Sequence, residues 1–177
     1  ELFRSKMKEK IRIGCGAGFS GDRLEPALIL TEKGKLDYLV LECLAERTIA
    51  LAQKRKQQDP NAGYDVLLER RIEGLLPLLL QHKTRLITNM GAANPLAGAQ
   101  KILEIAQKLG LKVKVAVVLG DDVFDQLSGA ELSMEGNKPL EYYGKLVSAN
   151  AYLGVDAILP ALATDAQIIL TGRVADP

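Results

Sequence analysis

Short apolar runs alternate along the chain with longer stretches of helical periodicity. The apolar runs are rich in β-branched residues and end at glycine or polar residues, as strands do. They predict strands at Lys10–Cys15, Leu36–Cys43, Thr84–Thr88, Val113–Leu119, Leu146–Leu153 and Gln167–Thr171. The stretches between them predict helices at Asp22–Glu32, Leu44–Lys56, Tyr64–Leu80, Asn94–Lys108 and Asp156–Ala163.

Strand and helix alternation of this kind predicts an α/β fold with a mostly parallel sheet and right-handed crossovers. A doubly wound, Rossmann-like open sheet is the first interpretation, because six strands are too few to close an eight-stranded barrel. An incomplete (β/α) barrel is the alternative. Asp22 and Asn94 are typical N-cap residues for the helices that follow them. Phe124–Gly144 is polar and glycine-containing, which predicts a long loop over the strand ends.

Composition narrows the class of protein. The 177 residues fit one domain, and 23 basic against 22 acidic residues give a formal net charge of +1. This balance provides no overall field for binding nucleic acid or an anionic membrane. Two cysteines are too few for a disulfide scaffold, and no apolar run approaches the roughly 20 residues of a membrane span. We therefore predict a cytoplasmic protein that binds neither nucleic acid nor membrane.

Each predicted strand ends in a polar or glycine-containing segment. These segments read GCGAGFSGDR, ECLAERT, TNMGAANP, GDD, SANAYLG and TGRVADP. The carboxyl ends of parallel strands meet at one edge of a sheet, so the segments should converge on one rim and line a pocket.

The first of these segments contains Gly16, Gly18 and Gly21 in the spacing G-x-G-x-x-G. This pattern, between a strand and a helix and followed by Glu42 after the next strand, fits a dinucleotide-binding loop. The bulk of Phe19 and the position of Pro26 weaken that interpretation. General anion or carbonyl binding by the loop amides and a purely structural tight turn are the alternatives.

Two charged residues at strand ends are the catalytic candidates. Glu42 is placed for general acid/base work, and Arg173 can pair with an oxyanion unless an aspartate takes it. His82 ends a helix among polar residues, which favours a solvated position, and the acidic pair Asp121 and Asp122 lacks further ligands, so we predict no metal site. The predicted ligand-binding residues are Gly16, Gly18, Ser20, Gly21, Asp22, Arg23, Asn89, Asn94, Asn150 and Thr171.

Five segments taken in order resemble the acyclic terpene utilisation protein A (AtuA) family, formerly a domain of unknown function. They are IRIGCGAGFSGDR, LDYLVLECLAERTIALAQ, ITNMGAANP, SANAYLG and ILTGRVADP. The resemblance covers nearly the whole chain. It implies a role in catabolism of citronellol- and geraniol-type terpenes through CoA thioesters. It assigns no reaction, cofactor or catalytic residue. Family members continue past Pro177, so residues 1–177 are expected to be the amino-terminal portion of a longer α/β domain.

The leading hypothesis is an enzyme or enzyme subunit that acts on a small acid or an acyl-CoA thioester. The ligand would then be a small molecule, with a homo-oligomer left open and the cofactor unassigned. The alternatives are an NAD(P)-dependent oxidoreductase that uses the GAGFSG loop, and a non-catalytic partner subunit.

Overall fold

A five-stranded, entirely parallel sheet forms the centre of the computed structural model, which describes residues 10–175. The strands are β1 (Ile13–Ala17), β2 (Tyr38–Leu41), β3 (Arg85–Thr88), β4 (Val115–Val118) and β5 (Ile168–Thr171). Their order across the sheet is β1-β2-β3-β5-β4. The predicted α/β fold with an open parallel sheet is therefore confirmed, and the sheet does not close into a barrel.

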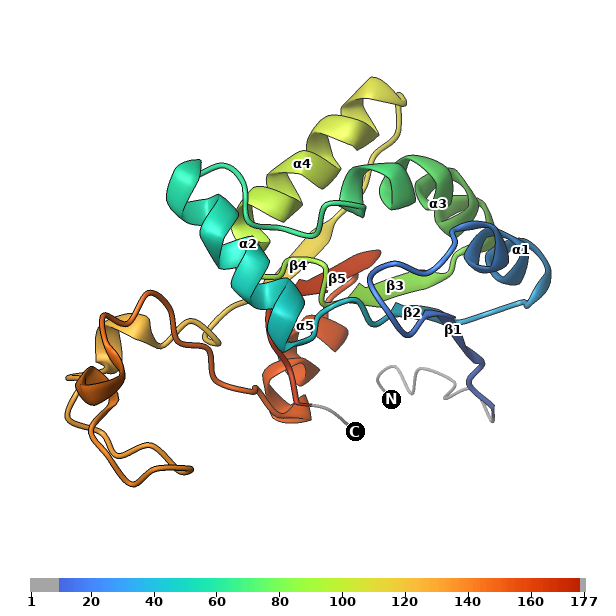
Figure 1. The fold of residues 1–177 in the computed structure, drawn as a ribbon. Coiled ribbons are helices and arrows are strands. Elements are labelled where there is room, and N and C mark those ends of the chain that lie inside the picture. Colours follow the sequence, from blue (N-terminus) through green and yellow to red (C-terminus); the bar gives the residue numbers. More distant parts are fainter. Residues whose placement is uncertain (1–9, 176–177) are drawn as a thin grey trace, which may run out of the picture.

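The helices cover the two faces of the sheet unequally (Figure 1). They are α1 (Glu25–Lys33), α2 (Glu46–Gln58), α3 (Leu68–His82), α4 (Pro95–Lys108) and α5 (Leu159–Leu162). From β1 to β4 the chain always moves in one direction across the sheet, so right-handed crossovers put α1, α3 and α4 on the same face. The return from β4 to β5 runs the other way and puts α5 on the opposite face.

The main core lies between the sheet and α1, α3 and α4. Alternate residues of β2 and β3, such as Leu39 and Leu86, are fully buried there. Helix α3 turns Leu68, Ile72 and Leu75 into the same core, at the spacing of one helical face. A smaller cluster of Val118, Ile169 and Ala161 lies on the α5 side. The sheet is thus held firmly enough to fix the positions of its carboxyl-end loops.

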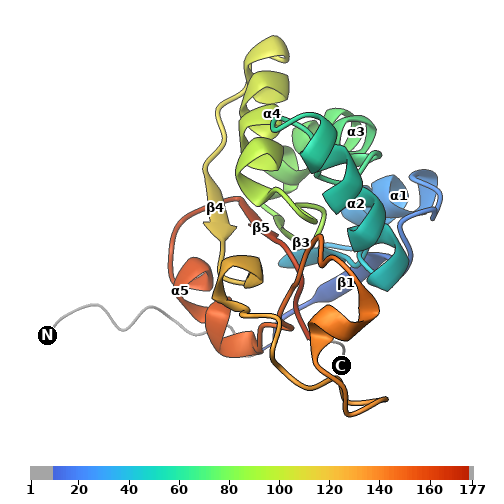
Figure 2. The same cartoon turned by 60° about the vertical axis from the view of Figure 1, so that its left-hand side comes forward.

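A long segment of irregular structure connects β4 to α5. It contains the 3₁₀ turns η1 (Phe124–Gln126), η2 (Leu140–Tyr143) and η3 (Val155–Ala157). Figure 1 shows the part around η2 projecting away from the sheet, and in Figure 2 the same part comes forward. The predicted loop at Phe124–Gly144 agrees with this course, and η3 with α5 replaces the predicted helix Asp156–Ala163.

The prediction of a strand at Leu146–Leu153 is wrong. This segment forms only isolated bridges, from Asn150 to Asp122 and from Leu153 to Val174. The position beside β4 within the sheet is taken by β5. Asn150 instead uses its side chain to bond Asp121, which fixes the segment across the strand ends without a ladder.

The two predicted helix caps have different outcomes. Asn94 caps α4 as expected, because its side-chain oxygen accepts the N–H of Ala97. Asp22 does not cap a helix: α1 begins three residues later, with Leu24 at its N-cap. Asp22 turns its carboxylate back onto the loop before it, where Oδ2 accepts the N–H of Gly18.

Candidate functional site

The glycine-rich loop after β1 folds around the carboxylate of Asp22. Oδ2 of Asp22 accepts the N–H of Gly18 at 2.9 Å and the N–H of Phe19 at 3.1 Å. The backbone N–H of Asp22 donates to the carbonyl of Phe19 at 3.0 Å, which closes the turn. The loop amides of Gly18 and Phe19, which the sequence offered for binding a ligand anion, are therefore bonded to the carboxylate of Asp22.

The three glycines of the G-x-G-x-x-G pattern serve different purposes. A Cβ on Gly16 would lie 2.7 Å from Leu41 and 3.0 Å from Ala27, so this glycine lets α1 approach the sheet. A Cβ on Gly21 would meet the ring of Phe19 at 2.5 Å. A Cβ on Gly18 would meet nothing within 4 Å, so close packing does not require a glycine at this position.

The loop departs from a dinucleotide-binding loop at its end. In the dinucleotide pattern the last glycine leads directly into a helix whose N-terminus holds the pyrophosphate. Here α1 begins at Glu25, and Phe19 stands 62% exposed beside the amides. The spacing in the sequence therefore matches the pattern while the backbone geometry differs from it.

Arg71, on α3, clamps the loop from the core side. Its Nη2 donates to the carbonyls of Ser20 at 2.8 Å and Asp22 at 3.0 Å. The hydroxyl of Ser20 donates to Asp65 at 2.8 Å. Arg71 and Asp65 are both buried, and neither was among the predicted site residues. The signal for Arg71 was present, because it falls on the apolar stripe of α3 beside Leu68 and Leu75.

Glu42, the predicted acid/base, lies directly after β2 and beside the glycine-rich loop. Its N–H donates to the carbonyl of Ala17 at 2.9 Å. Its carboxylate Oε1 accepts the N–H of Leu44 and the side-chain amide of Asn89, both at 2.9 Å. Within residues 10–175 no hydrogen bond reaches the other oxygen, Oε2, and the side chain is only half-buried.

Asn89 joins the ends of β2 and β3. Its Oδ1 accepts the N–H of Cys43 at 2.7 Å while its Nδ2 donates to Glu42. At 6% exposure, Asn89 is fixed in place by these two bonds. The structure therefore brings Glu42 and Asn89 together, with Gly18, Ser20 and Asp22 on the neighbouring loop. We call this group the open half of the rim.

Cys43 lies beneath the open half and is chemically quiet. Burial, partly offset by the guanidinium of Arg71, raises the pKa of the Cys43 thiol to about 12. Nη1 of Arg71 donates to the sulfur at 2.7 Å. Cys15 is exposed. The buried thiol therefore contributes packing and a hydrogen bond, while Cys15 is open to reagents in solution.

A second polar group gathers at the ends of β4 and β5, which we call the closed half of the rim. Asp121 is 3% exposed and its Oδ2 accepts the N–H of Arg173 at 2.8 Å and the amide of Asn150 at 3.0 Å. Asn150 in turn accepts a bond from Gln53 on α2 at 3.1 Å. A Cβ on Gly172 would lie 2.5 Å from Asp121, so only glycine fits against this carboxylate.

Arg173 is buried in the closed half, with 1% exposure. Its Nη1 donates to the carbonyl of Leu44 and its Nη2 to Glu46 at 3.1 Å. Its guanidinium carbon lies 3.9 Å from the centre of the Tyr152 ring, a stacking geometry favourable to arginine. The hydrogen bond from Tyr152 lowers the pKa of Glu46, with Arg173 adding to the effect. The guanidinium thus joins α2 to Tyr152 and to the chain after β5.

The remaining predicted residues lie apart from Glu42 or serve the backbone. Asn94 bonds the carbonyls of Pro60 and Ala62, so it fastens the loop before α3 as well as capping α4. Thr171 is buried at the end of β5. Arg23 is exposed and follows Asp22 at the end of the glycine-rich loop.

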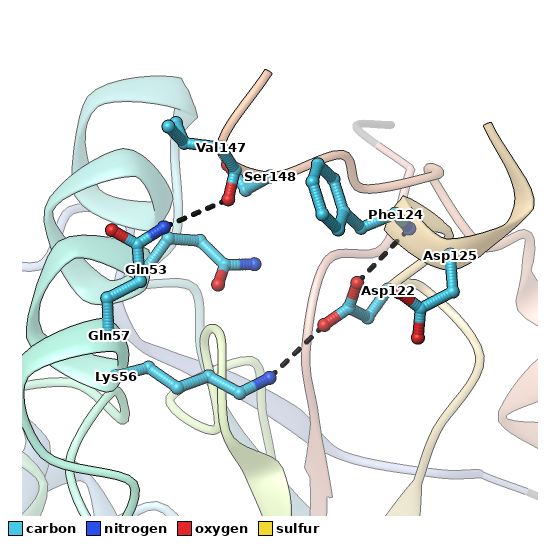
Figure 3. A pocket seen from close by; sticks show the side chains of 8 residues that line it. All are labelled: Gln53, Lys56, Gln57, Asp122, Phe124, Asp125, Val147 and Ser148. Carbon is cyan, nitrogen blue, oxygen red and sulfur yellow. Dashed lines mark hydrogen bonds and ion pairs between the residues drawn. The ribbon is translucent and has the colours of Figure 1, made fainter. Parts of the chain in front are cut away.

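Two cavities of about 320 Å³ each open at the surface. One lies at the glycine-rich loop and is lined by Cys15, Gly16, Ala17, Gly18, Asp22, Arg23 and Pro26. The other lies between α2 and the segment after β4 (Figure 3), where Lys56 pairs with Asp122 at 3.1 Å and Gln57 donates to the carbonyl of Val147. None of the predicted site residues lines this second cavity.

The family of the chain is shown by a match over nearly its whole length. Residues 11–177 match the family model described as "Acyclic terpene utilisation family protein AtuA". The chain belongs to this family. Membership supports a catabolic role related to terpene utilisation. Neither a curated protein nor a solved structure matches the chain.

Two features are absent from residues 10–175. None of their helices combines the length and the apolar character that a membrane crossing requires. Their His, Cys, Asp and Glu side chains nowhere gather in a group of three that could hold a metal ion.

Proposed function

We propose that the protein is an enzyme, or a subunit of one, that binds a small acid or an acyl-CoA thioester at the open half of the rim. Family membership supports the metabolic setting. The cavity of about 320 Å³ at the glycine-rich loop has room for the head group of such a ligand. The NAD(P)-dependent alternative has no comparable support, because the loop departs from dinucleotide geometry at α1.

The observation that carries the proposal is the way Glu42 is held. One carboxylate oxygen is fixed by Leu44 and Asn89, while no described residue bonds the other. A carboxylate fixed at one oxygen has a defined direction, and its second oxygen can accept a proton from a ligand and return it. Glu42 is therefore proposed as the acid/base.

We give Arg173 a positioning role in this scheme. Its guanidinium contacts Leu44, two residues after Glu42, and Glu46 at the start of α2. It therefore supports the backbone that carries Glu42. The earlier prediction, in which Arg173 pairs with the charge of the substrate, stays the alternative role and requires Glu46 to release it.

The test is growth of the source organism on an acyclic terpene alcohol, with each variant of the whole protein replacing the wild type. Glu42→Gln keeps the shape and an oxygen for the bond from Asn89 but cannot take up and return a proton, so we expect growth to stop at normal protein levels. Glu32→Gln, an exposed site on α1, is the matched control. Wild-type growth of Glu42→Gln would overturn the acid/base role.

A second experiment addresses the non-catalytic alternative. The whole protein, purified from the source organism under native conditions, is analysed for stoichiometric partners and for turnover of acyl-CoA thioesters. Turnover that disappears in Glu42→Gln supports the proposal. A stable complex whose activity is identical with Glu42→Gln would assign this chain the role of a partner subunit.

A further inference from the structure

The glycine-rich loop presents two neighbouring backbone N–H groups to a single point. Those of Gly18 and Phe19 both donate to Oδ2 of Asp22, at 2.9 Å and 3.1 Å. Converging loop amides of this kind form concave sites that bind phosphate and carboxylate groups in many proteins. In this protein the carboxylate that fills the site belongs to the loop itself.

The loop does not depend on the Asp22 side chain for its shape. Arg71 donates to the backbone carbonyls of Ser20 and Asp22, and the N–H of Asp22 donates to the carbonyl of Phe19. The Ser20 hydroxyl is fixed by Asp65. All these contacts remain if the Asp22 carboxylate swings into solvent, so the two amides stay in place for another acceptor.

Room and charge for a ligand are present at the same place. The cavity of about 320 Å³ is lined by Gly18, Asp22 and Arg23. No atom lies within 4 Å of the position that a Cβ on Gly18 would take, and the Asp22 side chain is exposed to solvent. Arg23 forms no ion pair with any residue of the described part of the chain, so its guanidinium can attract and pair with an incoming anion.

We propose that Asp22 is a displaceable plug of an anion site formed by the amides of Gly18 and Phe19 with Arg23. The site takes the carboxylate or a phosphate group of the ligand, which expels the Asp22 carboxylate. The inference rests on the proposed function, because the ligand it describes is the small acid or CoA thioester. It adds that a residue of the loop itself, Asp22, bonds the two amides until the ligand replaces it.

Calorimetric titration of the whole protein with sodium acetate and, separately, with pyrophosphate tests the plug. Asp22→Ala should bind one of these probes roughly ten- to a hundredfold more tightly than the wild type, since two charge-assisted bonds no longer need to be broken. Asp22→Asn, which keeps a weaker neutral acceptor, should gain less. A preference for pyrophosphate would indicate the phosphates of CoA, and a preference for acetate the carboxylate of a free acid.

The matched control is Asp156→Ala, which removes the same charge from the exposed turn η3 and should leave both titrations unchanged. In Asp22→Ala the further change Arg23→Ala should reverse most of the gain. If Asp22→Ala and Asp22→Asn are both folded and bind neither probe more tightly than the wild type, the plug is refuted. That result leaves Glu42 untouched, whereas a failure of the Glu42→Gln test leaves the titrations of Asp22→Ala unchanged.

Discussion

The two halves of the rim are built from the same sequence pattern and differ in what covers them. In both, parallel strands end in polar residues. A cavity opens at the loop after β1, and after β2 Glu42 keeps one carboxylate oxygen without a bond from the described residues. At β4 and β5, Asp121 and Arg173 are 3% and 1% exposed. The difference comes from the segment that carries Asn150 and Tyr152, which crosses the second half and uses its polar groups.

A charged residue at a strand end can act on a ligand only if its charge is not already paired within the fold. The carboxylate of Asp121 is bonded to Asn150 and to the backbone of Arg173. The guanidinium of Arg173 is bonded to Leu44 and Glu46. From their charge alone, Asp121 and Arg173 would be stronger candidates for ligand binding than Asn89. Their partners indicate stability of the fold as their main contribution.

The largest effect is expected on the closed half. Arg173→Ala should lower the free energy of unfolding by about 2–4 kcal/mol, because it leaves the carbonyl of Leu44 without its donor and removes packing against Tyr152. Urea denaturation measures the change. Arg47→Ala, an exposed arginine on α2, should change stability by less than about 0.5 kcal/mol. Equal stabilities for the two variants would contradict a structural role for Arg173.

The next largest effect should come from a single methyl group. Gly172→Ala places a Cβ against both carboxylate oxygens of Asp121, so Asp121 must move from its partners, at a cost of about 1–3 kcal/mol. Gly154→Ala has open space and ordinary backbone angles, and it should be neutral or slightly stabilising. Thermal unfolding of the pair checks this. An unchanged unfolding temperature for Gly172→Ala would contradict the close contact between Gly172 and Asp121.

A smaller effect separates the two cysteines. Cys15 is exposed, whereas Cys43 is buried with a pKa raised to about 12, so at pH 8 only Cys15 should react quickly with a thiol reagent. Cys43 should react only after the protein unfolds. Cys15→Ser should abolish the fast phase in a spectrophotometric thiol assay. A fast phase that survives in Cys15→Ser would show that the region beneath Glu42 opens readily.

The smallest effect concerns the projecting segment after β4. The backbone N–H of Ser128, with the Ser128 hydroxyl and Gly129, lowers the pKa of Glu131 to about 2 from an ordinary 4.5. Because the folded value is depressed, these contacts stabilise the segment above about pH 4.5 and lose that contribution as the pH falls toward 2. NMR titration of the Glu131 carboxyl carbon measures the midpoint. A midpoint near 4.5 would show that the turn is not formed in solution.

The sequence predicted the fold and much of the rim, but it did not predict which polar side chains are bonded to other residues of the protein. Apolar runs located all five strands, and Asn94-Pro95 located the start of α4. The direction in which Asp22 turns could not be predicted, because capping a helix and bonding its own loop use the same oxygen. Arg71 was overlooked although it interrupts the apolar stripe of α3, a position where a charge needs buried partners.

The closed half was harder to predict for a further reason. The burial of Arg173 depends on the course of residues between β4 and β5, a segment without strong periodicity. The apolar residues of Leu146–Leu153 predicted a strand, whereas the polar side chain of Asn150 joins this segment to Asp121 and Gln53. Contacts between residues so far apart in sequence leave no local signal.

Mapping ligand binding on the amide spectrum of the protein tests whether the ligand lies at the open half of the rim. Titration with an acyl-CoA thioester, followed by ¹⁵N NMR, should shift the amides of Gly18, Phe19, Glu42 and Asn89 and leave those of Asp121, Asn150 and Arg173 in place. Shifts concentrated at Arg173, or at Lys56, Asp122 and Phe124 around the cavity beside α2, would contradict the assignment of the ligand to the open half.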